Sequence, residues 1–160
     1  MSMRILGIDP GLQRTGYGCV DCGRAGRVQV VEAGILRLQA RATVAARLVA
    51  LERDLTELIA ELRPHRVAVE QVFVHAKHVR TAVIMAHARG VILLAAARAD
   101  IPISEIAPTT VKSSLTGNGH ATKRQMQLAI AARCGLAKPP SPADVADALA
   151  VALADANRQR

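Results

Sequence analysis

Apolar and polar residues alternate along the chain in blocks that predict short strands followed by helices. The apolar run at residues 4–9 ends at Pro10-Gly11, a pattern typical of a buried strand that closes in a turn. Two segments rich in β-branched residues, 15–22 and 28–38, follow on either side of a Gly-rich break. We therefore predict a meander of three antiparallel strands at the start of the chain.

The central part of the chain changes to a helical period. Apolar residues recur at helical spacing over 43–62, which predicts an amphipathic helix that Pro64 ends. A buried strand is expected over 67–72, and a second helix over 79–99. The latter half of that helix is apolar on nearly all sides, so we expect it in the core or against another subunit.

A further strand and three helices complete the prediction. The strand is expected over 102–107, and the helices over 109–115, 122–134 and 141–157, with Thr122 and Ser141 as N-caps. The order β-β-β-α-β-α-β-α-α-α indicates one α/β domain over 1–160. Its mixed five-stranded sheet has three antiparallel strands and two parallel ones, flanked by helices. A strand-helix-strand crossover should place the first strand beside the fourth.

Composition narrows the class of protein. The 160 residues carry a formal net charge of +8. This charge favours a protein that binds a polyanion such as nucleic acid, and the alternative is a basic protein that has no such partner. The three cysteines make no disulfide framework and are expected to be small buried residues in a reducing compartment. We see no signal peptide, and charged residues make 82–99 a poor membrane span, so a cytoplasmic protein without membrane attachment is predicted.

Four carboxylates have settings that suggest one metal site. Asp9 ends the first strand, Glu70 ends the apolar run of the fourth, and Asp144 and Asp147 lie three residues apart on one face of the last helix. The first and fourth strands should bring Asp9 and Glu70 to the same sheet edge. Carboxylate oxygens suit Mg²⁺, and two such ions can clamp the attacking and leaving oxygens of a phosphoryl displacement.

Each carboxylate also has a simpler interpretation. Asp9 before Pro-Gly could only form the turn, and Asp144 and Asp147 could only favour the N-terminal end of a helix dipole. Glu70 is harder to explain in this way, because a carboxylate that ends a buried strand is costly unless it is paired or bound to metal. The combination of the four supports the metal-site hypothesis.

Several motifs resemble the RuvC family of Holliday-junction resolvases, in order from about residue 3 to 154. They are Gly7-Ile-Asp-Pro-Gly11 with Thr15-Gly-Tyr-Gly18, Val69-Glu-Gln-Val-Phe73, Ala88-Arg-Gly-Val91 and Ala143-Asp-Val-Ala-Asp-Ala-Leu-Ala150. The resemblance implies an RNase H-like fold, with catalytic carboxylates at Asp9, Glu70, Asp144 and Asp147. It also implies a homodimer that binds four-way DNA junctions and nicks two strands of like polarity with Mg²⁺ or Mn²⁺. A branch-migration complex of the RuvA and RuvB type is the implied partner.

The resemblance also implies residues that contact DNA. The family's junction-probing aromatic falls on Phe73, and its DNA-contacting lysines on Lys112 and Lys123. From the residues alone, Phe73 could stack on an unpaired base or be an ordinary core residue. Lys77 and Arg80 follow it in the same predicted loop.

Two features near these basic residues bear on DNA contact. Lys112, Lys123 and Arg124 flank a Gly117-Asn-Gly119 loop and could neutralise phosphates or simply form a solvated face. Relatives commonly read Ala-Lys-Asn after the aromatic, whereas this chain reads Val74-His-Ala-Lys-His78. Contacts in that loop are therefore expected to differ.

Three other functions compete with a junction resolvase. An RNase H-like nuclease could cut another structured nucleic acid, such as a ribosomal RNA precursor. A binding module could recognise junctions without cutting them, although four intact carboxylates argue against this. An actin-like nucleotide-binding protein is the least favoured, because that architecture normally needs two such domains and a second phosphate loop.

Overall fold

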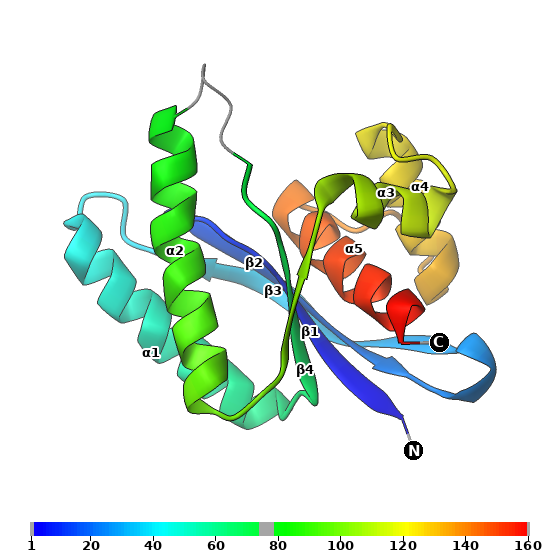
Figure 1. The fold of residues 1–160 in the computed structure, drawn as a ribbon, viewed down its shortest axis with the longest axis horizontal. Coiled ribbons are helices and arrows are strands. Elements are labelled where there is room, and N and C mark those ends of the chain that lie inside the picture. Colours follow the sequence, from blue (N-terminus) through cyan, green and yellow to red (C-terminus); the bar gives the residue numbers. More distant parts are fainter. Residues whose placement is uncertain (1, 74–78, 160) are drawn as a thin grey trace.

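The computed structural model, which describes residues 2–73 and 79–159, contains a five-stranded mixed sheet between two groups of helices (Figure 1). The strand order is β3-β2-β1-β4-β5, with β1 in the centre. β1 pairs antiparallel with β2 and parallel with β4, which confirms the predicted meander and crossover. The strands are β1 Met3–Asp9, β2 Arg14–Cys22, β3 Val28–Arg37, β4 Arg66–Glu70 and β5 Ile103–Ile106.

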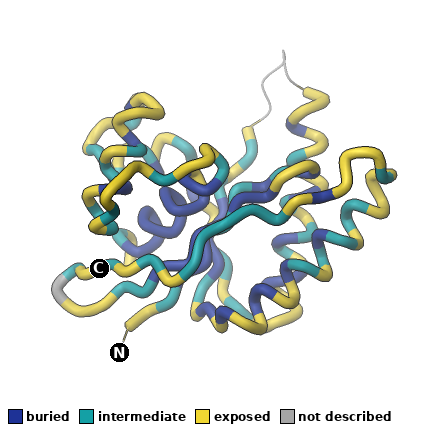
Figure 2. The backbone as a smooth tube through the Cα atoms, turned by 180° about the vertical axis from the view of Figure 1, so that it is seen from behind, coloured by how far each residue is buried: buried dark blue, intermediate teal, exposed yellow. Residues whose placement is uncertain are grey.

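The helices form one layer on each face of the sheet. α1 and α2 pack together on one face, and α3, α4 and α5 cover the other (Figure 1). Buried residues are concentrated along the sheet and along α5 (Figure 2). The helices are α1 Val44–Leu62, α2 Val79–Arg98, α3 Pro108–Thr116, α4 Lys123–Cys134 and α5 Ala143–Arg158, and a 3-10 turn covers Arg24–Gly26.

The predicted elements are all found, and their ends differ by one or two residues. Thr122 caps α4 as expected, because its side chain accepts from Gln125 N while the Gln125 side chain accepts from Thr122 N. The predicted cap at Ser141 is wrong. Pro142 is the N-cap of α5 with extended backbone, and its carbonyl accepts from the first turn. Strand β4 ends at Glu70 rather than residue 72, because its ladder with β5 ends there.

Helix α5 lies unusually close to β1 and β2 because glycines line the strands beneath it. A Cβ atom added at Gly7 would overlap the backbone oxygen of Ala148, and one added at Gly18 would overlap the Leu149 side chain. α5 itself presents alanines to the sheet, and every residue from 145 to 156 is buried except Asp147, which is exposed. Small residues on both surfaces therefore bring the helix backbone down to the strands.

The far end of α5 is held by a buried ion pair. Asp155 is fully buried, and Arg66 Nε of β4 donates to its Oδ2 at 3.0 Å. Arg66 Nη2 also donates to Ser104 Oγ at 2.6 Å, so one guanidinium joins α5, β4 and β5. Removing one partner would leave the other charge unpaired, so the contact links the position of α5 to β4 and β5.

Helix α2 has one buried face and one exposed apolar face. Ala88, Ile92 and Ala96 are buried against α1 and the sheet, whereas Val83 and Leu94 are 49% and 45% exposed. By length and composition alone this is the one helix in the described ranges that could span a membrane, but it packs against α1 and β5. The latter half of α2, which we expected in the core or against another subunit, is thus partly in the core and partly exposed.

The glycine contact generates a stability prediction. Gly7→Ala should lower the free energy of unfolding by the upper part of the ~1–3 kcal/mol typical of overpacked cores, because the backbone of α5 must move. Gly23→Ala is the matched control, since its added Cβ would meet only Arg27 atoms, at 3.9 Å. Urea unfolding of both variants measures the difference. Equal stability of the two would contradict the close-packing account.

Candidate active site

Two of the four predicted carboxylates end neighbouring parallel strands. Gly7 of β1 is opposite Ala68 of β4 in the ladder, and Asp9 and Glu70 each lie two residues further along. Because side chains alternate along a strand, Asp9 shares the α5-facing side with Gly7, and Glu70 shares it with Ala68. Both carboxylates therefore leave the sheet at the same edge and toward the same helix.

The other two carboxylates come from the N-terminal end of α5. Asp144 is in the first turn of the helix, and Asp147 follows three residues later. Asp9 pairs with Gly16 across the β1–β2 hairpin, and a Cβ at Gly16 would overlap the backbone oxygen of Asp144. The close approach of α5 to the hairpin thus delivers Asp144 beside Asp9.

The turn that follows Asp9 is held by side-chain hydrogen bonds. Thr15 is fully buried, and its Oγ1 donates to Gly11 O at 2.7 Å and accepts from Gly11 N at 3.3 Å. Arg47 of α1 supports the turn from the other layer, because its Nη1 donates to Leu12 O at 3.3 Å and its Nε to Ala42 O at 3.1 Å. Sequence reasoning missed Arg47, since nothing in the local pattern of α1 indicates a contact with the hairpin.

The cluster is electrostatically crowded around Asp9. Burial is the largest cause that raises the pKa of Asp9 to about 7. The negative charges of the other three carboxylates raise it further, in the order Asp147, Asp144 and Glu70, whereas Lys123 lowers it. The other three predicted carboxylates are therefore close enough to Asp9 to disfavour its ionised form.

Two lysines face the same carboxylates. Burial is the main cause that raises the pKa values of Glu70 and Asp147, and Lys112 opposes the rise at both. Lys123 lowers the pKa of Asp147 as well. Both lysines line a hollow of about 260 Å³ together with Glu70 and Asp147. The structure therefore brings these two predicted residues to the carboxylates.

Asp9 and Asp144 line a second hollow, of about 410 Å³, next to the hairpin turn. Arg14, the first residue of β2, lies there with its Nη2 3.1 Å from Asp144 Oδ2. The approach does not meet hydrogen-bond geometry, so this buried oxygen has no hydrogen-bond partner. Arg14 was not predicted as a site residue. Its place inside the motif between Pro-Gly and Thr-Gly-Tyr-Gly was the available signal.

The chemistry of the cluster fits a hard divalent cation. The four carboxylates supply the oxygen ligands that such ions prefer, and Asp144 Oδ2 is buried without a hydrogen-bond partner. In this conformation no three Asp, Glu, His or Cys side chains of residues 2–73 and 79–159 converge tightly enough to chelate one ion. Ligation would thus require the carboxylates to turn toward a common point from their present two hollows.

The remaining predicted site residues are exposed near the ends of β4, α2 and α4, or lie outside the residues that the structure describes. Phe73 is 58% exposed just past β4, so the core alternative for this residue is wrong. Arg80 is exposed at the start of α2, and Arg124 is exposed on α4. Lys77 and the altered loop at 74–78 lie outside the described residues.

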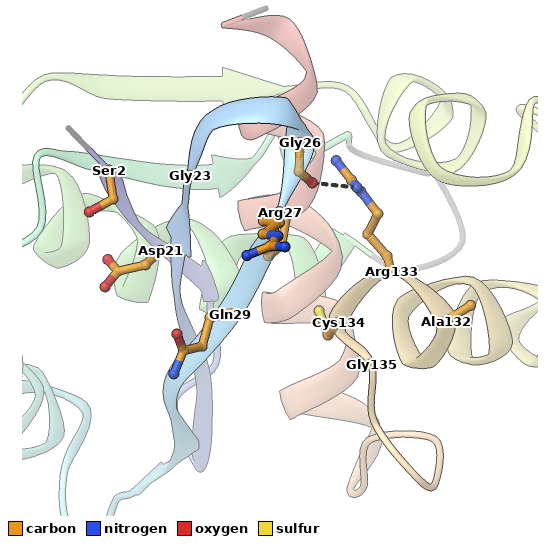
Figure 3. A pocket seen from close by; sticks show the side chains of 11 residues that line it. Ser2, Asp21, Gly23, Gly26, Arg27, Gln29, Ala132, Arg133, Cys134 and Gly135 are labelled. Carbon is orange, nitrogen blue, oxygen red and sulfur yellow. Dashed lines mark hydrogen bonds between the residues drawn. The ribbon is translucent and has the colours of Figure 1, made fainter.

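Other polar features lie away from the carboxylates. A hollow of about 640 Å³ is found at the opposite end of β1, where Arg133 donates to Gly26 O at 2.8 Å (Figure 3). Asp21 lines it but is already paired with Arg4. Among the cysteines only Cys19 is buried, and Cys22 and Cys134 are half-buried, so the expectation that all three are buried is wrong for two of them.

Comparison with known proteins gives a consistent result. Residues 5–155 match the family profile described as crossover junction endodeoxyribonuclease RuvC. A protein of that name from Halorhodospira halophila is 47% identical over 156 residues, covering 98% of this chain and 91% of its own. One from Rhodopirellula baltica is 46% identical over 150 residues, covering 93% and 83%.

Solved structures agree with the sequence match. The T. thermophilus RuvC structure in complex with a Holliday junction substrate superposes with a TM-score of 0.92 at 32% identity, covering 99% of this chain and 95% of the other. The yeast mitochondrial Holliday junction resolvase Ydc2 superposes with a TM-score of 0.70 at 14% identity, covering 98% and 80%. The second likeness shows the shared fold alone.

The raised pKa of Asp9 generates a pH prediction for the metal-free protein. A folded-state pKa of about 7, above the unfolded value of 3.8, means that the folded state binds the proton more tightly. Stability in EDTA should therefore fall as pH rises from about 4 to about 7, and stay low above that. Asp9→Asn removes the charge, so it should stabilise the metal-free protein at pH 8 by on the order of 2 kcal/mol.

Urea unfolding of wild type and Asp9→Asn at about pH 5 and pH 8 measures this effect. The gap between the two proteins should be larger at the higher pH. A variant that is equally or less stable than wild type at pH 8 would show that Asp9 is not electrostatically strained.

Proposed function

The chain belongs to the RuvC family of crossover junction endodeoxyribonucleases, and from this premise we propose that it resolves four-way (Holliday) DNA junctions. The proposed reaction is metal-dependent hydrolysis of phosphodiester bonds, with paired nicks in two strands of like polarity during recombination and repair. One observation carries the proposal. The carboxylates of Asp9, Glu70, Asp144 and Asp147 come from three separate segments and gather at one edge of the sheet, where the other three raise the pKa of Asp9.

We assign the four carboxylates as the residues that hold the metal and the reacting phosphate. RuvC-family nucleases are metal-dependent, and Mg²⁺, with Mn²⁺ as a substitute, is the proposed ion, two per site. When bound, these ions would activate a water and stabilise the charge on the phosphate. Asp9 at the end of the central strand is the proposed bridge, with Glu70 on one side and the two aspartates of α5 on the other.

The basic residues around the carboxylates have a separate role in the proposal. Lys112 and Lys123 face Glu70 and Asp147, where they favour the ionised carboxylates and can neutralise phosphate oxygens. Arg124 and Arg80 are exposed and are proposed to contact the DNA backbone further from the cut, as is Lys77. The net charge of +8 supports a polyanionic substrate.

Phe73 is proposed to probe the junction. Its side chain is 58% exposed, so the ring is available for stacking, and it follows the strand that carries Glu70. Bases at a junction centre are open to stacking, which is worth ~1–3 kcal/mol per base. Stacking there would fix which phosphate enters the carboxylate cluster.

The apolar surface of α2 supports a proposal for assembly. A hollow of about 620 Å³ between α1 and α2 is lined mostly by apolar side chains, among them Leu48, Val91 and Leu94. We propose that a second copy covers it, because a two-fold dimer suits a substrate with two equivalent strands to cut. Sedimentation at micromolar concentration tests this, and a monomer would contradict it.

We further propose that residues 1–160 act as a single nuclease domain in the cytoplasm, beside a RuvA- and RuvB-type motor.

The direct test of function compares substrates. A synthetic four-way junction, a linear duplex of the same sequence and a structured RNA are incubated with Mg²⁺ or with EDTA, and the cut positions are mapped. We expect nicks at related positions in two opposed strands of the junction, and only with Mg²⁺. Asp9→Asn should lose at least about 10³-fold in nicking rate while junction binding survives. Binding without nicking by wild type, or preferred cleavage of RNA, would contradict the proposal.

Phe73→Ala generates a second functional prediction. Loss of one stacking contact should slow junction nicking by about ten-fold or more, since each 1.4 kcal/mol is a factor of ten. Because the side chain is exposed, the melting temperature should change little. Phe73→Tyr keeps the ring and is the matched control. An unchanged nicking rate in Phe73→Ala, with normal nicking in the control, would exclude stacking.

A further inference from the structure

The carboxylate cluster has a guanidinium of its own, supplied by the same hairpin that carries Asp9. Arg14 opens β2, and its Nη2 lies 3.1 Å from Asp144 Oδ2. The Arg14 side chain is 50% exposed, and that of Asp144 is 24% exposed. The guanidinium thus reaches from the solvent side onto one proposed ligand of the metal.

The contact between Arg14 and Asp144 is loose. It lies within ion-pair distance, yet Asp144 Oδ2 is buried without a hydrogen-bond partner. By contrast, Arg4 makes two hydrogen bonds to Asp21, at 2.8 and 2.9 Å. A half-exposed ion pair without aligned hydrogen bonds contributes little to stability. A doubly charged cation can therefore displace the guanidinium from Asp144 with little loss of stability.

The other positively charged side chains near the site make contacts with groups other than Asp144. Arg47 shares the hollow with Arg14, but its guanidinium donates to the carbonyls of Leu12 and Ala42. Lys112 and Lys123 line the other hollow. Within the described part of the chain, Arg14 is therefore the cation that pairs with Asp144.

We propose that Arg14 is a resident counter-ion of Asp144 that a divalent cation displaces. The inference rests on the metal role proposed above for the carboxylate cluster. A doubly charged ion that ligates Asp144 Oδ2 competes for the same oxygen that Arg14 now faces. Arg14 is thus a positioning residue: it neutralises and holds Asp144 when metal is absent, and it weakens metal binding until the ion outcompetes it.

The test measures Mn²⁺ binding to the DNA-free protein by electron paramagnetic resonance of the free ion. Arg14→Gln should bind Mn²⁺ about two- to five-fold more tightly than wild type. The expected change is small because a partly exposed ion pair contributes little free energy, so Arg14 can oppose the binding of Mn²⁺ only weakly. The same variant should be slightly less stable than wild type in EDTA, because Asp144 has lost its partner. A merely structural arginine would lose both stability and metal affinity.

Two controls separate the possible failures. Arg53→Gln removes an exposed arginine that is paired with Asp54 on α1, and it should leave Mn²⁺ affinity unchanged. Asp9→Asn should weaken Mn²⁺ binding. If it does not, the metal site itself is wrong. If Asp9→Asn weakens binding but Arg14→Gln leaves it unchanged or weaker than wild type, the counter-ion role of Arg14 is overturned while the metal site stands.

Discussion

The close contact of α5 with the β1–β2 hairpin is the constraint on which the site depends. Gly7, Gly16 and Gly18 remove the side chains that would hold the helix away, and alanines on α5 complete the contact. At the other end, Asp155 is tied to Arg66 inside the core. Because the helix cannot slide or lift, its first two turns bring Asp144 and Asp147 to the end of the central strand.

This arrangement gathers negative charge where a folded protein would normally avoid it. Burial and the charges of the other three carboxylates raise the pKa of Asp9 to about 7, and Lys123 opposes this rise only in part. An unfavourable cluster of this kind is expected where function needs it, since its repulsion is relieved when a divalent cation binds. The rest of the fold supplies the stability that the cluster removes.

Much of this could be predicted from sequence because each signal is local. The run before Pro10-Gly11 marks β1, and the crossover through α1 places β4 beside it, so the meeting of Asp9 and Glu70 follows from periodicity and topology. The approach of α5 depends on glycines and alanines from distant segments, which no local pattern connects. Arg47 was missed for the same reason, whereas Arg14 lies inside a motif that could have indicated it. The Ser141 cap failed because Pro142 starts the helix one residue later.

The central claim is that the four carboxylates form one cation site. Crystals of the protein soaked with Mn²⁺, measured by anomalous scattering at the manganese edge, test it most directly. The account predicts anomalous density among Asp9, Glu70, Asp144 and Asp147, with Asp9 as a shared ligand. Density only elsewhere on the molecule, with the four side chains left in their two separate hollows, would contradict it.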